Sequence, residues 1–571
     1  MPVRFYFLIK WVPFYGILFL FVLCLSACND DSGQIASKAK SATTTKTPTP
    51  ATIQLSFTYA LEKESWITEV TSQFNTKHYK TNDGQTIHVE AFPMNSNQII
   101  NEALSGIKKP HLISPASSVF IEFGNAKSVQ KTGTQIVPYT KNLVLSPIVI
   151  ALRKPIAEAI GWDKKDIGWA EMLSLTKNPQ DWTTYHYPKW GRFKLGYPHP
   201  EYSNSGLLSL FAQVYVGADK LTHLSKADLD KPQIADYLHN IQQMVECYGP
   251  SSQFFQEKLL NNAPGDLSAA ILYEHQVIQS YQQQNLSQKV VAIYPKEGTL
   301  FSNHPIGIVE RDWITPAHYE AAQFFIDYLL DKSQQQKALQ YGFRPANVSV
   351  PLASPIDIAH GVNPLAPKMI LEMPTVDMME AIIKIWHQYK KPANIVLVLD
   401  TSGGMRGEKI LHARTMALQL LEIVKEADYF SLLSFNHSLN WIAKNIQVKS
   451  QQKWLKRQFN YQFPGGGTAL YDAIFNAYTF LQKNSFPDKI AVMIVLSDGG
   501  DSHSELNFKD LLRKIPFNSD TSPIRIFAVG YGSITDKKRL NEIAKITQGK
   551  FYDGAMVDVD KIFKKEMASL F

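Results

Sequence analysis

The stretch Ile395-Val-Leu-Val-Leu-Asp400-Thr-Ser-Gly-Gly404 decides how the last third of this 571-residue chain folds. Its five consecutive apolar residues predict a strand buried on both faces, as strands of a parallel sheet are. The polar residues after it predict a loop at the carboxyl end of that strand, where open α/β sheets bind their ligands. Polar groups that follow neighbouring strands would meet Asp400 at the same edge.

The region from Ala393 to Phe571 alternates apolar runs with amphipathic segments. In the first amphipathic segment, one stripe faces the core and consists of Ile410, Ala413, Ala417, Leu420 and Val424. An antiparallel edge strand near residues 441–448 would complete a doubly wound, Rossmann-like sheet. The predicted strands are 395–399, 429–435, 490–496 and 524–529, and the predicted helices are 409–426, 469–481, 505–514 and 537–547.

Five groups of polar residues in this region predict a divalent-metal site when they are taken together. Each alone is an ordinary helix cap, turn or βα loop. Hydroxyl and carboxylate oxygens on rigid strand ends are, however, the ligands that a hard cation such as Mg²⁺ prefers. The groups are Asp400-Thr-Ser402-Gly-Gly404, Asp428, Ser434-Phe435, Gly465-Gly-Gly-Thr468 and Ser497-Asp498-Gly499.

This set resembles the metal-ion-dependent adhesion site of von Willebrand factor A domains. The resemblance implies that Asp400, Ser402, Thr468 and Asp498 hold Mg²⁺ or another divalent cation. It also implies a protein partner that offers a carboxylate to the metal. Gly404 stands where the family has a second serine, so water must fill that place, and we expect reduced metal affinity or a vestigial site.

The N-terminus predicts export and a lipid anchor. Arg4 and Lys10 precede an apolar run, residues 11–25, that is short for a membrane span and leads into Ser-Ala-Cys28. The arrangement resembles a bacterial lipoprotein signal in which residues 1–27 are removed and Cys28 is lipidated. An uncleaved anchor is the alternative, and both interpretations place the rest outside the cytoplasm. Residues 28–52, rich in Ser, Thr, Ala, Lys and Pro, predict a flexible tether.

Residues 53–371 have α/β texture and enough length for two lobes. A strand at 52–59 and a helix carrying Trp66, Val70 and Phe74 begin this region, and one helix is expected over 319–340. Several motifs resemble bacterial extracellular solute-binding proteins, which implies two α/β lobes joined by hinge strands with a small solute in the cleft. These motifs are Pro115-Ala-Ser-Ser118, Ser146-Pro-Ile-Val149, Tyr294-Pro-Lys-Glu-Gly298, His304-Pro305 and Gly342-Phe-Arg-Pro345.

Two places in this region are candidate solute ligands. Ser203 and Ser205 precede an apolar helix, and hydroxyls with free N–H groups at a helix start can hold an anion or a polar ligand. A plain N-cap is the alternative. Tyr273 and Glu274 follow an apolar run, where they would face either the cleft or solvent.

A bridging helix and linker, residues 372–392, connect this region to the domain at 393–571. Met378, Ile382, Trp386 and Tyr389 lie on one stripe of the helix. Removal of the signal and lipidation of Cys28 leave only Cys247, so no intramolecular disulfide is expected, and core filling is the expected role of Cys247. The net charge of +7 comes without a basic block, which argues against nucleic-acid binding.

The sequence favours a binding protein over an enzyme. It contains no His-Glu-x-x-His, no Gly-x-Ser-x-Gly and no Gly-x4-Gly-Lys-Ser/Thr phosphate loop. We expect a lipid-anchored extracytoplasmic protein whose metal-site domain recognises a protein partner while the cleft binds or senses a solute. The alternative is the substrate-binding component of an ABC-type transporter, with the C-terminal domain as an accessory.

Overall fold

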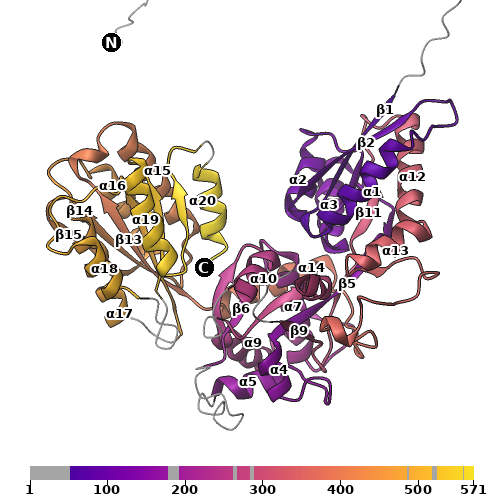
Figure 1. The fold of residues 1–571 in the computed structure, drawn as a ribbon, viewed down its shortest axis with the longest axis horizontal. Coiled ribbons are helices and arrows are strands. Elements are labelled where there is room, and N and C mark those ends of the chain that lie inside the picture. The colour runs from indigo at the N-terminus through magenta and orange to yellow at the C-terminus, as the bar shows by residue number, and fades with distance from the viewer. Residues whose placement is uncertain are drawn as a thin grey trace, which may run out of the picture. The chain divides into compact units, whose positions relative to one another are not determined.

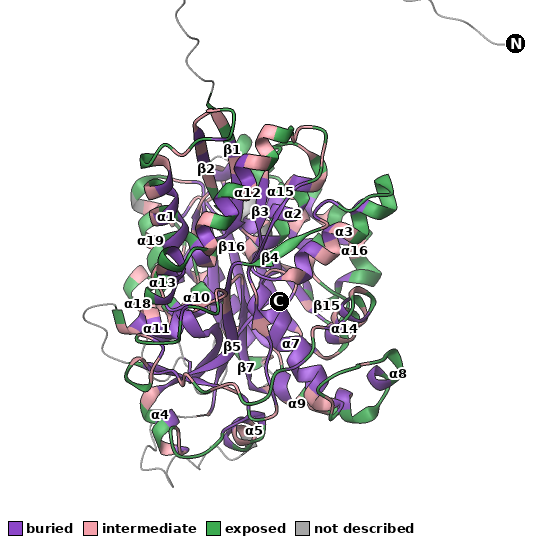
Figure 2. Cartoon of the chain, turned by 90° about the vertical axis from the view of Figure 1, so that its right-hand side faces the viewer, coloured by how far each residue is buried: buried purple, intermediate pink, exposed green. Residues whose placement is uncertain are grey.

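The computed structural model of the protein describes residues 52–177, 192–261, 267–282, 289–484, 488–516, 524–556 and 559–570. Residues 50–571 form one compact unit. It contains a five-stranded, a seven-stranded and a six-stranded sheet. Figure 2 shows most strand residues buried, with exposed residues on edge strands, on the outer faces of helices and on loops.

The first sheet and the helices around it are called the first lobe. Its strand order is β2-β1-β3-β11-β4, and β1 pairs in parallel with β2 and β3. The strands are β1 (Ile53–Ala60), β2 (Ile87–Met94), β3 (Leu112–Ser114), β4 (Thr140–Asn142) and β11 (Pro305–Ile308). The helices are η1 (Leu61–Lys63), α1 (Glu64–Thr76), α2 (Ser96–Ser105), α3 (Ser118–Thr132), α12 (Pro316–Leu330) and α13 (Lys332–Gln340).

The predicted apolar stripe of α1 is confirmed, because Trp66, Val70 and Phe74 are fully buried. The single helix expected over 319–340 is wrong, since α12 and α13 are separate. Asp331 between them has extended backbone angles, and its carboxylate accepts a hydrogen bond from the Ser333 N–H, which starts a new helix.

The second sheet and its helices are called the second lobe. The long strand β5 (Val144–Arg153) pairs with four others, all antiparallel to it. These partners are β8 (Ala269–Tyr273), β9 (Val290–Ile293), β10 (Phe301–Ser302) and β12 (Arg344–Pro345), and β6 (Leu195–Pro198) and β7 (Val245–Gly249) continue the sheet. The chain crosses between the lobes three times, at Leu143, at Asn303 and His304, and between α13 and β12 at residues 341–343. Cys247 in β7 is buried and unpaired, as expected.

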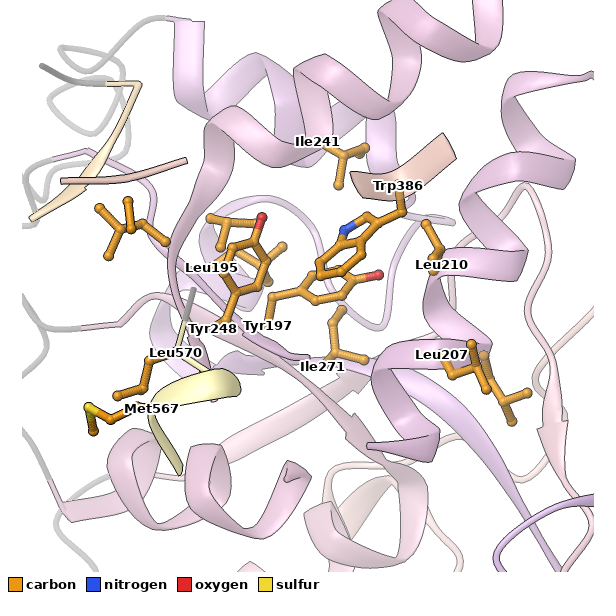
Figure 3. Packing of buried hydrophobic residues seen from close by; sticks show 14 of the residues in the cluster. Leu195, Tyr197, Leu207, Leu210, Ile241, Tyr248, Ile271, Trp386, Met567 and Leu570 are labelled. Carbon is orange, nitrogen blue, oxygen red and sulfur yellow. The ribbon is translucent and has the colours of Figure 1, made fainter. Parts of the chain in front are cut away.

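The helices of the second lobe include α14 (Val376–Tyr389), which was expected to be a bridge. Its residue Trp386 is fully buried, with its ring 4.7 Å from that of His199 and 5.7 Å from that of Tyr248 (Figure 3). The helix is therefore part of the core of this lobe. The other helices are α4 (Lys154–Ala159), α5 (Trp169–Lys177), α7 (Asn204–Gly217), α8 (Lys226–Leu229), α9 (Pro232–Met244), α10 (Ser252–Asn261) and α11 (Glu274–Gln282), and η3 (Ile358–His360) follows β12.

The third sheet has the order β15-β14-β13-β16-β17-β18 and is parallel except for β15, as the sequence predicted (Figure 1). The short strand β18 was not predicted. The strands are β13 (Ala393–Asp400), β14 (Tyr429–Phe435), β15 (Leu439–Gln447), β16 (Ile490–Ser497), β17 (Arg525–Gly530) and β18 (Phe551–Asp553).

Helices cover both faces of this sheet because side chains alternate along β13. Ile395, Leu397 and Leu399 pack with the buried stripe of α15, while Val396 and Val398 pack with the apolar faces of α17, α18 and α19. The helices are η4 (Gly403–Met405), α15 (Glu408–Ile423), α16 (Val448–Asn460), α17 (Leu470–Lys483), α18 (Phe508–Lys514), α19 (Ile534–Ile546) and α20 (Val559–Ala568). The sequence analysis missed α16 and α20, and Val424 lies just past the end of α15.

Among the described residues, no helix combines the length and the apolar character that a membrane span requires. The predicted signal segment and Cys28 lie outside the described residues.

Candidate metal site and solute cleft

Three neighbouring strands of the third sheet bring their carboxyl ends to one edge. β13 lies between β14 and β16, with Asp400 in register with Phe435 and Leu399 with Leu496. The loops that follow these strands therefore begin side by side, beyond the carboxyl ends of a doubly wound sheet. Ligands bind at such an edge.

Backbone hydrogen bonds join these loops to the glycine-rich segment 465–468. The N–H of Gly465 donates to the Thr401 carbonyl at 2.8 Å, and the N–H of Gly403 donates to the Gly466 carbonyl at 3.0 Å. The N–H of Ser502, in the loop after β16, donates to the Thr468 carbonyl at 2.8 Å. The predicted ligand Thr468 thus lies between the two loops that carry Asp400 and Asp498.

Asp400 is fully buried and held by two donors. The N–H of Ser402 donates to its Oδ1 at 2.8 Å, and the Ser497 hydroxyl donates to its Oδ2 at 2.5 Å. Burial raises the pKa of Asp400 to about 6, against the lowering effect of these hydrogen bonds. A cation beside this carboxylate would offset the cost of burying its charge.

The hydroxyl of Ser402 supports the same reading. Ser402 is fully buried; its hydroxyl lies close enough to the Asp400 carboxylate to lower the pKa of that group, and its Oγ has no other partner among the described residues. A buried hydroxyl oxygen that accepts no hydrogen bond is costly unless some group satisfies it. A divalent cation held by Asp400, Ser402 and Thr468 would do so with the oxygen donors that Mg²⁺ prefers, so the residues present fit the ion.

Gly404 is the residue that departs from the family pattern, and the side chain of Asp498 lies against it. A Cβ atom built on Gly404 would lie 2.2 Å from Oδ2 of Asp498. The Asp498 side chain, which is 14% exposed, thus occupies the space of the missing serine side chain. Lys409, in the first turn of α15, approaches the same carboxylate, with its Nζ 3.4 Å from Oδ2 of Asp498. The sequence analysis missed Lys409, although it lies only five positions after Gly404.

Asp428 does not belong to this site, which corrects the grouping made from the sequence. It precedes β14 and therefore lies at the opposite, amino end of the sheet. Its carboxylate accepts hydrogen bonds from the N–H groups of Ala393 and Lys425, both at 2.8 Å. Ser434 does lie at the carboxyl edge, where its hydroxyl donates to Gln462 Oε1 at 2.7 Å.

No cluster of three His, Cys, Asp or Glu side chains in the described parts of the chain could hold a metal.

A cavity of about 520 Å³ is lined by residues of both lobes. The first lobe contributes Glu62 and Glu64, and the second contributes the start of α7 and of α10. Most of the lining is polar without being cationic, and the described lining residues include no lysine or arginine. Carboxamides and hydroxyls complete it, among them Asn95, Ser96, Asn97, Ser203, Asn204, Ser251, Ser252, Gln253, Gln256, Gln276 and Gln279.

The four candidate solute ligands fall in different places. Ser203 lines the cavity, and its hydroxyl bonds that of Ser205 at 3.0 Å rather than capping α7. Ser205 is fully buried and is absent from the described lining. Glu274 is also fully buried, and Arg344 binds it through two nitrogens at 2.8 and 2.6 Å. The contacts of Glu274 are therefore those of a structural ion pair.

Tyr273 is fully buried and joins the two lobes. Its hydroxyl donates to Glu62 Oε1 at 3.3 Å and accepts from Asn204 Nδ2 at 3.0 Å. Asn204 lies inside the segment 203–206 that the sequence offered as a candidate, although only its serines were named as ligands. Glu62 gave no signal in the sequence, because a single polar residue at a helix start does not indicate a cleft that two distant segments form.

The chain matches two family models. Residues 55–344, about half of the chain, match the family described as bacterial extracellular solute-binding protein. Residues 394–565 match the von Willebrand factor type A domain.

Among curated proteins, the chain is similar to the inter-alpha-trypsin inhibitor heavy chain H2 of Mesocricetus auratus, at 27% identity over 165 residues. This match covers 28% of this chain and 17% of that protein. An uncharacterized protein of Mycobacterium tuberculosis is 24% identical over 265 residues, which cover 43% of this chain and 35% of that protein. The chain thus spans about a third or less of the length of these relatives.

Two solved structures are similar to parts of this chain. Maltose-bound MalE3 of T. maritima has a TM-score of 0.41 and 13% identity, covering 59% of this chain and 94% of that chain. A von Willebrand factor type A structure from Catenulispora acidiphila has a TM-score of 0.27 and 19% identity, covering 31% of this chain and 42% of that chain.

Proposed function

Because the chain belongs to the bacterial extracellular solute-binding protein family and carries a von Willebrand factor type A domain, we propose that it is a membrane-anchored extracytoplasmic recognition protein. Domains of both kinds are typically non-catalytic binding modules, and the solute-binding fold is typically extracytoplasmic. In the proposal, lipidation of Cys28 anchors the chain, the metal edge of the third sheet recognises a protein partner and the cleft binds a small solute.

The observation that carries the metal-dependent part is the buried hydroxyl oxygen of Ser402, which accepts no hydrogen bond among the described residues, beside the buried carboxylate of Asp400. Asp400, Ser402 and Thr468 would hold the ion, and Asp498 would face it from the loop after β16. A bound divalent ion supplies a Lewis acid that accepts a carboxylate from a partner. The rigid strand ends fix the donors, so that the partner meets a preformed site.

The test is a pull-down of partners from membranes with the full mature chain, with and without a chelator. Loss of the partner on chelation, and with Asp400→Ala, supports the proposal. Glu505→Gln, which removes an exposed carboxylate near the same edge, is the control and should keep the partner. Capture of a permease that resists chelation would overturn metal-dependent recognition and support the transporter alternative.

The lining of the cavity favours a solute that donates hydrogen bonds or carries a positive charge. Glu62 and Glu64 supply carboxylates, and Asn204, which is 4% exposed, has an unpaired Oδ1. Lys63 is next to them in sequence but is fully buried, and its ammonium donates to the Ser114 carbonyl at 3.0 Å. An anion would therefore meet the carboxylates of Glu62 and Glu64 without a counter-charge, and its desolvation would be unfavourable.

A thermal-shift screen of uncharged, cationic and anionic solutes tests this assignment, because a ligand that binds the folded state raises its melting temperature. Glu62→Gln should lower the shift produced by a cationic solute. Glu90→Gln, an exposed carboxylate of the same lobe outside the cavity lining, should leave it unchanged. Stabilisation by anions alone would contradict the proposal.

A further inference from the structure

The space above Gly404 is filled by the carboxylate of Asp498 rather than by a side chain of residue 404. A Cβ atom at position 404 would come within 2.2 Å of Asp498 Oδ2 and 3.1 Å of its Cγ. Any side chain at 404 would therefore force the Asp498 carboxylate to rotate away. Glycine at this position is what allows Asp498 to adopt its present orientation.

The ammonium group of Lys409 contacts the carboxylate of Asp498. The Lys409 ammonium lies 3.4 Å from Asp498 Oδ2 and donates to the Gly404 carbonyl at 2.9 Å. Lys409 thus contacts both Gly404, which departs from the family pattern, and Asp498, whose carboxylate fills the space above Gly404. Its side chain is 39% exposed, so its ion pair with Asp498 is weak and the ammonium can leave without unfolding its surroundings.

We infer that Lys409 is a tethered cation that neutralises Asp498 in the metal-free protein, that a divalent ion must displace it, and that Gly404 makes this arrangement possible. The inference rests on the proposed metal-dependent function. Lys409 then raises the metal concentration at which the site is half occupied, because each binding event first breaks the contact between Lys409 and Asp498. Removal of the ammonium should tighten metal binding, which is the opposite of what loss of a ligand would do.

The experiment measures Mn²⁺ and Mg²⁺ dissociation constants of the full mature chain by calorimetry, together with the melting temperature at each metal concentration. Lys409→Met should bind Mn²⁺ about two- to fivefold more tightly than wild type, as expected for loss of one exposed ion pair. Lys453→Met removes an exposed lysine elsewhere in the same domain and should bind as wild type does.

A double-mutant cycle tests the role of Gly404. Gly404→Ser turns the Asp498 carboxylate away from Lys409, so adding Lys409→Met to Gly404→Ser should no longer change the affinity. An equal gain in both backgrounds would overturn this role of Gly404.

The outcomes separate the inference from the proposed function. If wild type binds metal and Lys409→Met binds equally or more weakly, the inference is wrong and the proposed function stands. If Lys409→Met binds metal and wild type does not, the inference is supported in its strongest form. If no variant binds either ion, the metal-dependent function fails and the inference fails with it.

Discussion

The Ser497 hydroxyl donates a hydrogen bond of 2.5 Å to Oδ2 of Asp400, so the last residue of β16 holds the last residue of β13. The same hydroxyl accepts from the N–H of Gly499 at 2.9 Å. One buried oxygen therefore connects the Asp400 carboxylate to the loop that carries Asp498.

Replacement of Ser497 by alanine should destabilise the metal-free protein by about 1–3 kcal/mol, because a buried carboxylate and a buried N–H each lose their partner. Chemical unfolding of the full chain measures this loss. Ser450→Ala, at an exposed position of the same domain, should cost much less. Equal stability of the two variants would contradict the role given to Ser497.

Because His275 is buried, it should make the free energy of unfolding decrease in acid. Burial, helped by the nearby Lys63 ammonium, lowers the pKa of His275 to about 3. An unfolded histidine takes up its proton near pH 6.5, so between pH 6.5 and 3 the unfolded state binds more protons than the folded one. This contribution to stability is present above pH 6.5 and is lost as the pH falls, by up to ~1.4 kcal/mol per pH unit.

Unfolding free energies measured from pH 7 to pH 4 should therefore fall less steeply for His275→Gln than for wild type. His239→Gln, at an exposed position of the same lobe, should follow the wild-type curve. If His275→Gln and wild type run parallel, His275 is not the group responsible.

Arg344 and Glu274 form a buried ion pair, and loss of one partner should destabilise the protein more than loss of both. Arg344→Met leaves the Glu274 carboxylate buried without its counter-ion and should cost about 3–5 kcal/mol. Adding Glu274→Gln removes the uncompensated charge, so the double variant should regain much of the lost stability. A double variant as unstable as the sum of the two single variants would show that the two side chains act independently.

Trp386 should dominate the attachment of α14. Trp386→Ala removes a fully buried indole between His199 and Tyr248, and the cavity left behind should cost about 3–5 kcal/mol. Gln388→Ala, on the exposed side of the same helix, should change stability little. Thermal and denaturant unfolding of the two variants provide the comparison.

The third sheet could be predicted from the sequence because its signals are local. Apolar runs such as Ile395 to Leu399 identify strands by themselves, and the order of Asp400, Thr468 and Asp498 along the chain fits one sheet edge. The break at Asp331 was missed, although residues 331–337 are all polar and follow the last residue of the apolar stripe, Leu329; the Asp331 carboxylate caps the start of α13.

Contacts between residues that are far apart in the sequence could not be predicted from the sequence. Asp428 looked like another polar residue beside a strand, and only the direction of β14 shows that it lies at the wrong end. Lys409 looked like a solvated helix residue until the Gly404 loop placed its ammonium near Asp498. Glu274 looked exposed after an apolar run, whereas its partner Arg344 comes from a segment 70 residues away.

The junction between α14 and β13 has a mechanical consequence. Only Lys390, Lys391 and Pro392 separate them, and three residues extend to about 11 Å at most. Both lysines are buried, and Lys391 donates to the Val245 carbonyl at 3.1 Å. A pull applied at the edge of the third sheet that carries Asp400 therefore meets almost no slack here. The load passes into α14 and, through Trp386, into the core of the second lobe, so a partner under tension would strain the solute-binding domain directly.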